Sequence, residues 1–400
     1  MRKFIDNIVT FFLSIMIIII SIGTVYFCLD VFGIIEVPQE YSIASLFYSQ
    51  IEVIANNGEI LTEDTFPIKK LRKNREDSTN AQQVVVKDVR DPIEVMEEIK
   101  EREKEQEREN FINVENYYYE QLDYYGRFIY EGLYNNLDKL KTGTFTINYD
   151  KAFNDLLNEE NGEDTLKNSF QLAINALTFD NPDLFYIDVT KMYLLMEKTT
   201  RAFSKTYKVS IGAGEEGSYL SEQFSSEEAV NDAINSIEQI KNEIVSSCED
   251  QSTKNKIKVV HDYLVDSIDY NSADGSNVYN VYGALINKRA VCEGYARACK
   301  YILDDLEIPC IIACGVGENR AGETESHAWN YVMLDGKWYA LDVTWDDPVV
   351  PENFRVSDES RYSYFLKGSD EFFKDHLEDG NIVGEAGFKY PSLSESDYNR

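Results

Sequence analysis

Apolar residues divide the chain into segments of very different character. From Ile8 to Leu29 about 22 residues are almost wholly apolar, with basic residues before the run and acidic residues after it. A helix of that length, rising about 1.5 Å per residue, spans the ~30 Å hydrocarbon core of a bilayer. The positive-inside rule then predicts a cytoplasmic tail over residues 1–7, an uncleaved single-pass anchor over 8–29 and an extracytoplasmic body. A cleaved signal peptide is the alternative, although its apolar region is normally only about 7–15 residues long.

Residues 30–110 are predicted to be a charged linker or stalk. The first part, to about residue 65, mixes short apolar patches with acidic residues and indicates no element. The stretch from Pro92 to Asn110 is dense in Glu, Lys and Arg and has few apolar positions. Such a pattern favours a solvent-exposed helix over a core helix. We therefore expect this segment to separate the folded part from the membrane.

Residues 111–215 are predicted to form a small N-terminal α/β region. Apolar residues at helical spacing predict helices over 124–133 and 165–178. An alternating pattern predicts a strand over 144–149, and two strand-like runs follow within 191–211. The region has no His and no Cys, so we expect no catalytic group in it.

The main domain is expected over residues 225–390. Ser225-Ser226-Glu227-Glu228 is typical of a helix N-cap and first turn, and this helix should run toward Cys248. A second helix is expected from Lys256 to about Ile268. The residues that indicate chemistry all follow these two helices.

Cys292 lies at the predicted start of a further helix. The apolar stripe of that helix consists of Ala296, Cys299, Ile302, Leu303 and Leu306. A helix N-terminus stabilises a thiolate through its unpaired N–H groups and the helix dipole. A cysteine at such a position is nevertheless more often structural than catalytic when nothing else supports it.

His327 and Asp342 are placed together by a predicted β-hairpin. Asp335-Gly336 lies between two strand-like runs and predicts a two-residue turn. The resulting register sets His327 opposite Thr344 and makes Asp342 its diagonal neighbour on the same face. A slip of one residue would separate the two onto opposite faces. A carboxylate in this position would fix the imidazole tautomer and stabilise the imidazolium.

Three motifs together resemble the bacterial, protease-like branch of the transglutaminase-like superfamily. They are Ala290-Val291-Cys292-Glu293-Gly294-Tyr295-Ala296, His327-Ala328-Trp329-Asn330 and the stretch from Asp335 to Pro348. The resemblance covers roughly residues 225–375. It implies a papain-like α+β core in which a catalytic helix packs on an antiparallel sheet. It also implies a catalytic triad of Cys292, His327 and Asp342.

The chemistry implied by the resemblance is thiol acyl transfer. The Cys292 thiolate would attack an amide carbonyl, His327 would protonate the departing amine, and Asp342 would orient His327. For the oxyanion hole the backbone N–H of Cys292 is the first candidate, and Tyr282 is a second. Trp329 and Trp345 are candidates for a substrate cleft, with strand core as an equal alternative.

The other cysteines and histidines are expected to be structural. Cys310 and Cys314 are four residues apart on a predicted strand, and two buried thiols are favoured over a metal pair or a disulfide. His261 and His376 are also expected to be structural. No His or Cys cluster has the spacing of a structural zinc site, so neither a metal nor a cofactor is expected.

Charge limits the expected partners. The formal net charge is −32, with 71 acidic residues against 39 basic ones, and nucleic acid would repel such a chain. A protein or peptide substrate, such as a cell-envelope peptide, is expected instead. Two functions stay open: a membrane-anchored, extracytoplasmic cysteine enzyme acting on peptide or glutamine amide bonds, and a catalytically silent binding or scaffold module of the envelope.

Overall fold

The computed structural model describes ten segments of the chain, with gaps between them. These are residues 49–55, 60–61, 116–201, 204–213, 217–271, 275–318, 322, 324–347, 358–378 and 387–399. The predicted anchor over 8–29 and most of the predicted stalk lie outside these residues. Among the helices that the model does describe, none combines the length and the apolar character that a membrane crossing needs.

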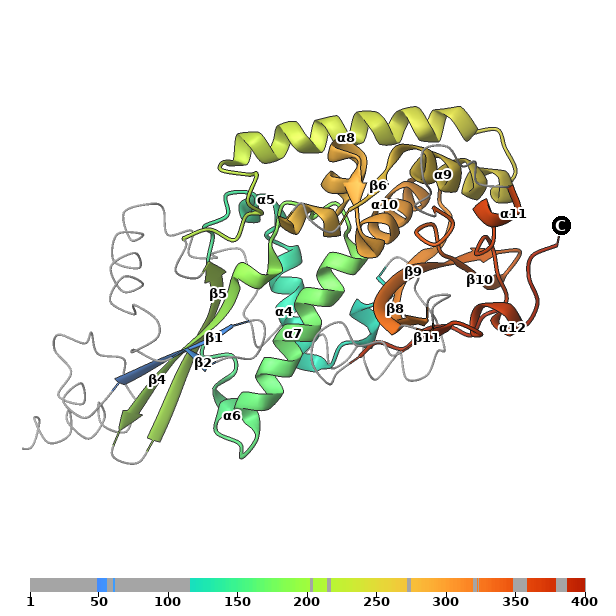
Figure 1. The fold of residues 1–400 in the computed structure, drawn as a ribbon. Helices are drawn as coiled ribbons and strands as arrows, with labels where there is room; N and C mark the ends of the chain where they lie inside the picture. Colours follow the sequence, from blue (N-terminus) through green and yellow to red (C-terminus); the bar gives the residue numbers. More distant parts are fainter. Residues whose placement is uncertain are drawn as a thin grey trace, which may run out of the picture.

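The N-terminal part is built on an antiparallel sheet with the strand order β2-β1-β4-β5-β3 (Figure 1). Its strands are β1 (Ser49–Ala55), β2 (Ile60–Leu61), β3 (Ile147–Asp150), β4 (Met192–Arg201) and β5 (Ser204–Ala213). The stalk prediction is wrong for β1 and β2, because β1 pairs with β4 along its whole length. The seven residues of β1 are too few to give a clear local signal, and the partner strand that stabilises them lies far away in the sequence.

Two helices of this part pack on each other. They are α4 (Tyr124–Tyr134) and α7 (Gly162–Asp180), which confirm the two predicted helices. Asp123 caps α4 by accepting the Gly126 N–H at 2.7 Å, and its other oxygen accepts the Ser169 hydroxyl of α7 at 2.7 Å. One carboxylate therefore fixes both the start of α4 and its position on α7. The shorter elements here are η3 (Tyr119–Gln121), α5 (Leu137–Leu140), α6 (Asn154–Leu157) and η4 (Val189–Lys191).

The C-terminal part is an α+β arrangement around a second sheet, of order β10-β9-β8-β11. Its strands are β8 (Cys310–Glu318), β9 (Thr324–Leu334), β10 (Lys337–Leu341) and β11 (His376–Glu378), and every neighbouring pair is antiparallel. Helix α10 (Cys292–Asp305) packs on β8 and β9. The side-chain amide of Asn330 on β9 donates to the Ala296 carbonyl of α10 at 3.0 Å, which fixes the helix on the sheet.

The predicted hairpin has the predicted register, since Leu334 pairs with Lys337. Asp335 and Gly336 have φ values of 51° and 75°, which are the left-handed values that a type I′ turn requires. The ladder ends earlier than predicted, because β10 stops at Leu341 and the chain then turns. Thr344 therefore has no ladder partner on β9. Asp342 begins a turn, which is closed by a hydrogen bond from the Asp346 N–H to the Asp342 carbonyl at 3.2 Å.

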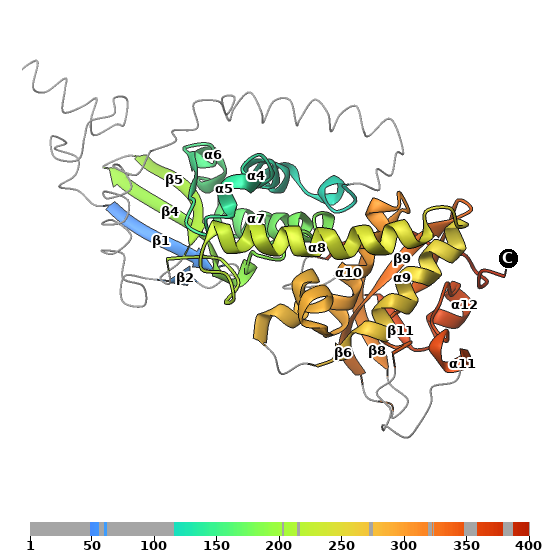
Figure 2. The same ribbon diagram turned by 90° about the horizontal axis from the view of Figure 1, so that it is seen from above.

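Helix α8 connects the two parts. It spans Glu227–Cys248, and Ser226 caps it by accepting the Ala229 N–H at 3.2 Å, as predicted. Figures 1 and 2 both show α8 lying across the N-terminal part and the C-terminal part, next to α9 (Thr253–Ser267). On its inner face Lys241 pairs with Asp305 at the end of α10, at 2.9 Å.

Tyr118 makes a second connection between the two parts. Its hydroxyl donates to the Ile312 carbonyl and accepts the Ile312 N–H, at the middle of β8. Its backbone N–H donates to Asp180, at the end of α7, at 3.0 Å. The remaining short elements of the C-terminal part are β6 (Asp269–Tyr270), η5 (Gly275–Tyr279), η6 (Gly283–Asn287, a π-helix), β7 (Arg289–Ala290), α11 (Asp358–Arg361) and α12 (Ser369–Phe372).

Candidate active site

Cys292 is the first residue of α10, as predicted. The parallel pair β6–β7 leads the chain into this position, and Asn271 donates its N–H to the Ala290 carbonyl at 3.0 Å. Gly294, in the first turn, allows close packing: a Cβ there would lie 2.4 Å from the Val278 carbonyl oxygen. Cys292 is partly exposed, whereas the other four cysteines that the structure describes are buried.

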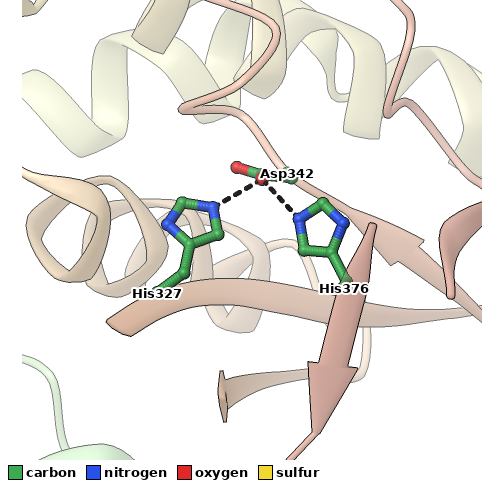
Figure 3. Close-up of side chains that lie close together, drawn as sticks. All are labelled: His327, Asp342 and His376. Atoms are coloured by element: carbon green, nitrogen blue, oxygen red, sulfur yellow. Dashed lines mark hydrogen bonds and ion pairs between the residues drawn. The ribbon is translucent and has the colours of Figure 1, made fainter. Parts of the chain in front are cut away.

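His327 and Asp342 are in direct contact, as predicted. The Nε2 atom of His327 lies 2.7 Å from Asp342 Oδ2 (Figure 3), and both side chains are buried. This leaves Nδ1 as the nitrogen available to the Cys292 thiol. Burial opposes a charged His327, but the charge of Asp342 and its hydrogen bond, followed by the Cys292 side chain, raise the pKa of His327 to about 10. His327 is thus influenced by both Asp342 and Cys292.

The carboxylate of Asp342 is held from three sides. Besides His327, His376 Nε2 lies 3.2 Å from Oδ2 (Figure 3). The Trp345 N–H donates to Oδ1 at 3.1 Å. Burial alone would raise the pKa of Asp342, but the two imidazoles keep it well below its usual range. Asp342 is therefore ionised.

The same buried cluster is the place where a metal ion could bind among the residues described. The donor atoms of His327, Asp342 and His376 lie within 4.8 Å of one another, and two imidazoles with a carboxylate are ligands that suit zinc. However, both Nε2 atoms already lie at hydrogen-bond distance from one carboxylate oxygen. An ion would have to replace both hydrogen bonds, so the geometry favours the imidazole–carboxylate network.

Trp345 covers the two imidazoles, whereas Trp329 belongs to the core. The Trp345 ring stacks on His327 with centroids 5.0 Å apart and lies 4.4 Å from His376. Trp345 is partly exposed, which fits the cleft prediction. Trp329 is 1% exposed and packs edge-on against Phe372, which fits the core alternative.

Tyr282 is placed in an aromatic cluster. Its ring lies 6.0 Å from that of Phe185 and 5.1 Å from that of Phe224. These contacts join η6 to the N-terminal part and do not support Tyr282 as an oxyanion donor.

Tyr270 pairs with Ala290, two residues before Cys292, and the sequence analysis missed it. It is the last residue of β6 and is 41% exposed. Burial, then the charges of Cys292 and Glu325, raise its pKa to about 12. No local pattern marks this residue, because the pairing of β6 with β7 joins two two-residue strands that are separate in the sequence.

The remaining cysteines and His261 have structural positions. Cys299, Cys310 and Cys314 are buried, and burial raises the pKa of Cys310 well above that of an ordinary thiol. His261 lies between Asp262 and Asp346, at 3.0 Å and 3.1 Å. Through Asp346 it fixes the end of the turn that Asp342 begins.

Several known proteins are similar to parts of this chain. The curated protein Kyphoscoliosis peptidase of Mus musculus is 24% identical over 158 residues, covering 34% of this chain and 23% of that protein. The chain thus spans about a quarter of that relative's length. Similar solved structures include a TGase (16% identity, TM-score 0.27, 50% of this chain and 54% of that one). Another is the periplasmic domain of TgpA from Pseudomonas aeruginosa bound to ethylmercury (13% identity, TM-score 0.23, 38% and 72%).

A family model matches part of the chain. The model of the transglutaminase-like superfamily matches residues 238–343, and Cys292, His327 and Asp342 all lie inside that segment. The resemblance predicted from the sequence is thereby confirmed. The segment of this chain that matches the transglutaminase-like superfamily includes helix α10 and the hairpin β9–β10.

Proposed function

We propose that this protein is a membrane-anchored, extracytoplasmic cysteine enzyme that acts on peptide or glutamine amide bonds. The observation that supports the proposal most strongly is the position of His327: it is hydrogen-bonded to Asp342, and both Asp342 and Cys292 raise its pKa. The anchor and the topology rest on the apolar segment over residues 8–29.

The reaction follows from the protonation states. Asp342 is ionised and His327 holds its proton strongly, so the pair can keep Cys292 as a thiolate. The thiolate attacks the amide carbonyl carbon and forms a C–S bond. As the tetrahedral intermediate collapses, the C–N bond breaks and the proton on His327 passes to the departing amine. Water or a primary amine then attacks the thioester, gives its proton to His327 and releases the thiolate.

The oxyanion needs hydrogen-bond donors next to the thiol. The backbone N–H of Cys292, at the first position of α10, has no partner within the helix and is the first donor we assign. Tyr270 is the second. Because its pKa is raised to about 12, its hydroxyl keeps its proton at neutral pH and can donate it. This assignment replaces Tyr282.

Thiol reactivity tests the proposal. Full-length protein in detergent would be treated with iodoacetamide across a pH series, and labelling of each cysteine would be measured by peptide mass spectrometry. We expect Cys292 to label fast well below about pH 8.5, the ordinary thiol pKa, and His327→Ala to remove that advantage. The buried Cys248 and Cys314 are internal controls. If Cys292 behaves as an ordinary thiol, the silent scaffold module becomes the better account.

A further inference from the structure

Asp342 has a second imidazole partner that the three-residue mechanism does not use. His376 Nε2 lies 3.2 Å from Asp342 Oδ2, the same oxygen that lies 2.7 Å from His327 Nε2 (Figure 3). The two histidines come from opposite sides of β8, since His327 is on β9 and His376 is on β11. Along β8 their neighbours are Gly315 and Gly317, so no side chain of that strand separates them.

The other nitrogen of His376 also faces a carboxylate. Nδ1 lies 2.7 Å from Asp375 Oδ1, and the second oxygen of Asp375 accepts the Tyr364 hydroxyl at 2.7 Å. An ionised carboxylate can only accept hydrogen bonds, so both ring nitrogens of His376 must donate. Only the doubly protonated ring has two N–H groups. The geometry therefore describes His376 as an imidazolium between Asp375 and Asp342.

Aromatic rings hold His376 in this orientation. Phe372 stacks on it with centroids 4.0 Å apart, and Trp345 lies 4.4 Å away. His376 is 3% exposed. The titratable groups that face it are Asp342, Asp375, His327 and Tyr364. A polar ring in such an enclosed aromatic site is stabilised only if its hydrogen bonds are made.

We propose that His376 is a positioning residue that holds Asp342 and, as an imidazolium, offsets part of the negative charge that Asp342 presents to His327. The proposal rests on the function proposed above. With a single cation next to it, Asp342 would hold the His327 proton tightly and hinder its transfer to the departing amine. A second cation weakens that hold, and it also favours the Cys292 thiolate.

Removing the charge of His376 should therefore move the reactivity of Cys292 to higher pH. Loss of a nearby positive charge raises the pKa of a thiol and of an imidazolium alike. His376→Gln removes the charge but places an amide N–H close to the original Nε2, so the bond to Asp342 is kept. His376→Phe keeps the ring stack but removes both donors. Asp375→Asn leaves His376 in place but removes the carboxylate that accepts a hydrogen bond from the second N–H group of the His376 ring.

The test is the pH profile of iodoacetamide labelling at Cys292 in the full chain, with thermal melting of every variant. The acidic limb of this profile is the pH range over which the labelling rate of Cys292 rises to its plateau. We expect His376→Gln to shift this limb to higher pH by on the order of one unit and to leave the plateau rate unchanged. His376→Phe should give the same shift with a lower plateau, because Asp342 loses a donor. Asp375→Asn, at a one-third exposed residue, should shift the limb in the same direction.

The control is Lys374→Gln. It removes an exposed positive charge that is adjacent to Asp375 in the sequence and pairs with Glu371, so its profile should match the wild type. If the wild type has no acidic limb, the proposed function fails. If the wild type has the acidic limb and the profiles of His376→Gln and Asp375→Asn both superimpose on the wild-type profile, the proposed role of His376 is overturned, but the proposed function is not.

Discussion

The Trp345 indole occupies the space above Gly317 that a side chain would otherwise fill. A Cβ at Gly317 would lie 2.7 Å from Trp345 Cζ2 and 3.5 Å from His327 Cδ2. The Gly315-Val316-Gly317 segment of β8 thus has a packing role: it lets the indole lie on the imidazole.

Gly317→Ala should lower activity strongly while the protein still folds. The methyl group would displace Trp345 and, through it, His327, and overpacking of this kind costs about 1–3 kcal/mol of stability. We expect amide cleavage or amine incorporation to fall at least about tenfold, since small displacements of catalytic groups are costly. Val316→Ala, at the adjacent, partly exposed position, is the control. Wild-type activity in Gly317→Ala would contradict the packing role.

Asp342→Asn tests the charge of the carboxylate at nearly constant shape. The amide cannot stabilise the imidazolium, and it presents an N–H where Oδ2 accepts from two histidines. We expect a loss of about 10³–10⁴-fold in kcat, the size seen when a triad carboxylate is neutralised. Asp347→Asn is the matched control, because Asp347 directly follows the same turn and accepts the Tyr295 hydroxyl at 2.6 Å. Equal losses in both variants would point to the turn rather than the charge.

Tyr270→Phe should reduce turnover without changing thiolate formation. Removing one oxyanion donor typically costs about 10²–10³ in kcat. Labelling of Cys292 by iodoacetamide forms no oxyanion, so its pH profile should stay the same. Tyr279→Phe, at a nearby tyrosine that is 49% exposed, is the control for general effects at this surface. A change in the labelling profile of Tyr270→Phe would assign the residue to the thiol instead.

The stabilising contribution of His327 should disappear at alkaline pH. Folding raises its pKa from 6.5 to about 10, so the folded state binds the proton more tightly than the unfolded state. Such a contribution is complete below the ordinary pKa and is lost as the pH rises through the folded value. The difference in free energy of unfolding between wild type and His327→Gln, measured by urea denaturation, should shrink between about pH 6.5 and 10. A difference that stays constant across this window would refute the linkage.

The proposed topology predicts that the body of the protein is accessible from outside the cell. Protease added to intact cells should remove the C-terminal part and leave only a fragment that includes the apolar segment over residues 8–29. Lysed cells and a cytoplasmic marker protein provide the controls. Full protection in intact cells would exclude this orientation.

Contacts that depend on local sequence patterns could be predicted. Two residues, Asp335-Gly336, specify a turn whose register brings His327 and Asp342 together, and an apolar stripe places Cys292 at a helix start. The end of β10 was not predicted, because the turn that begins at Asp342 is held by contacts from other elements, including His261 to Asp346.

Contacts between distant short elements could not be predicted. His376 lies in a strand of three residues, and Tyr270 in one of two. Elements this short have no periodicity, and they form only because β8 and β7 supply hydrogen-bond partners. Strand β1 could not be predicted for the second of these reasons: it is paired with β4, which is separated from it by a long stretch of sequence.

The structural unit around the site is longer than the segment that the family model matches. The matched family segment ends at residue 343, before β11, yet β11 covers the outer edge of β8 and brings His376 to Asp342. A fragment cut at the family boundaries would have an unpaired β8 edge, which is a template for aggregation. It would also lack Tyr118, which pairs with Ile312 on that strand. Expression trials should therefore start before Tyr118 and extend beyond Glu378, whatever the borders of the recognisable domain.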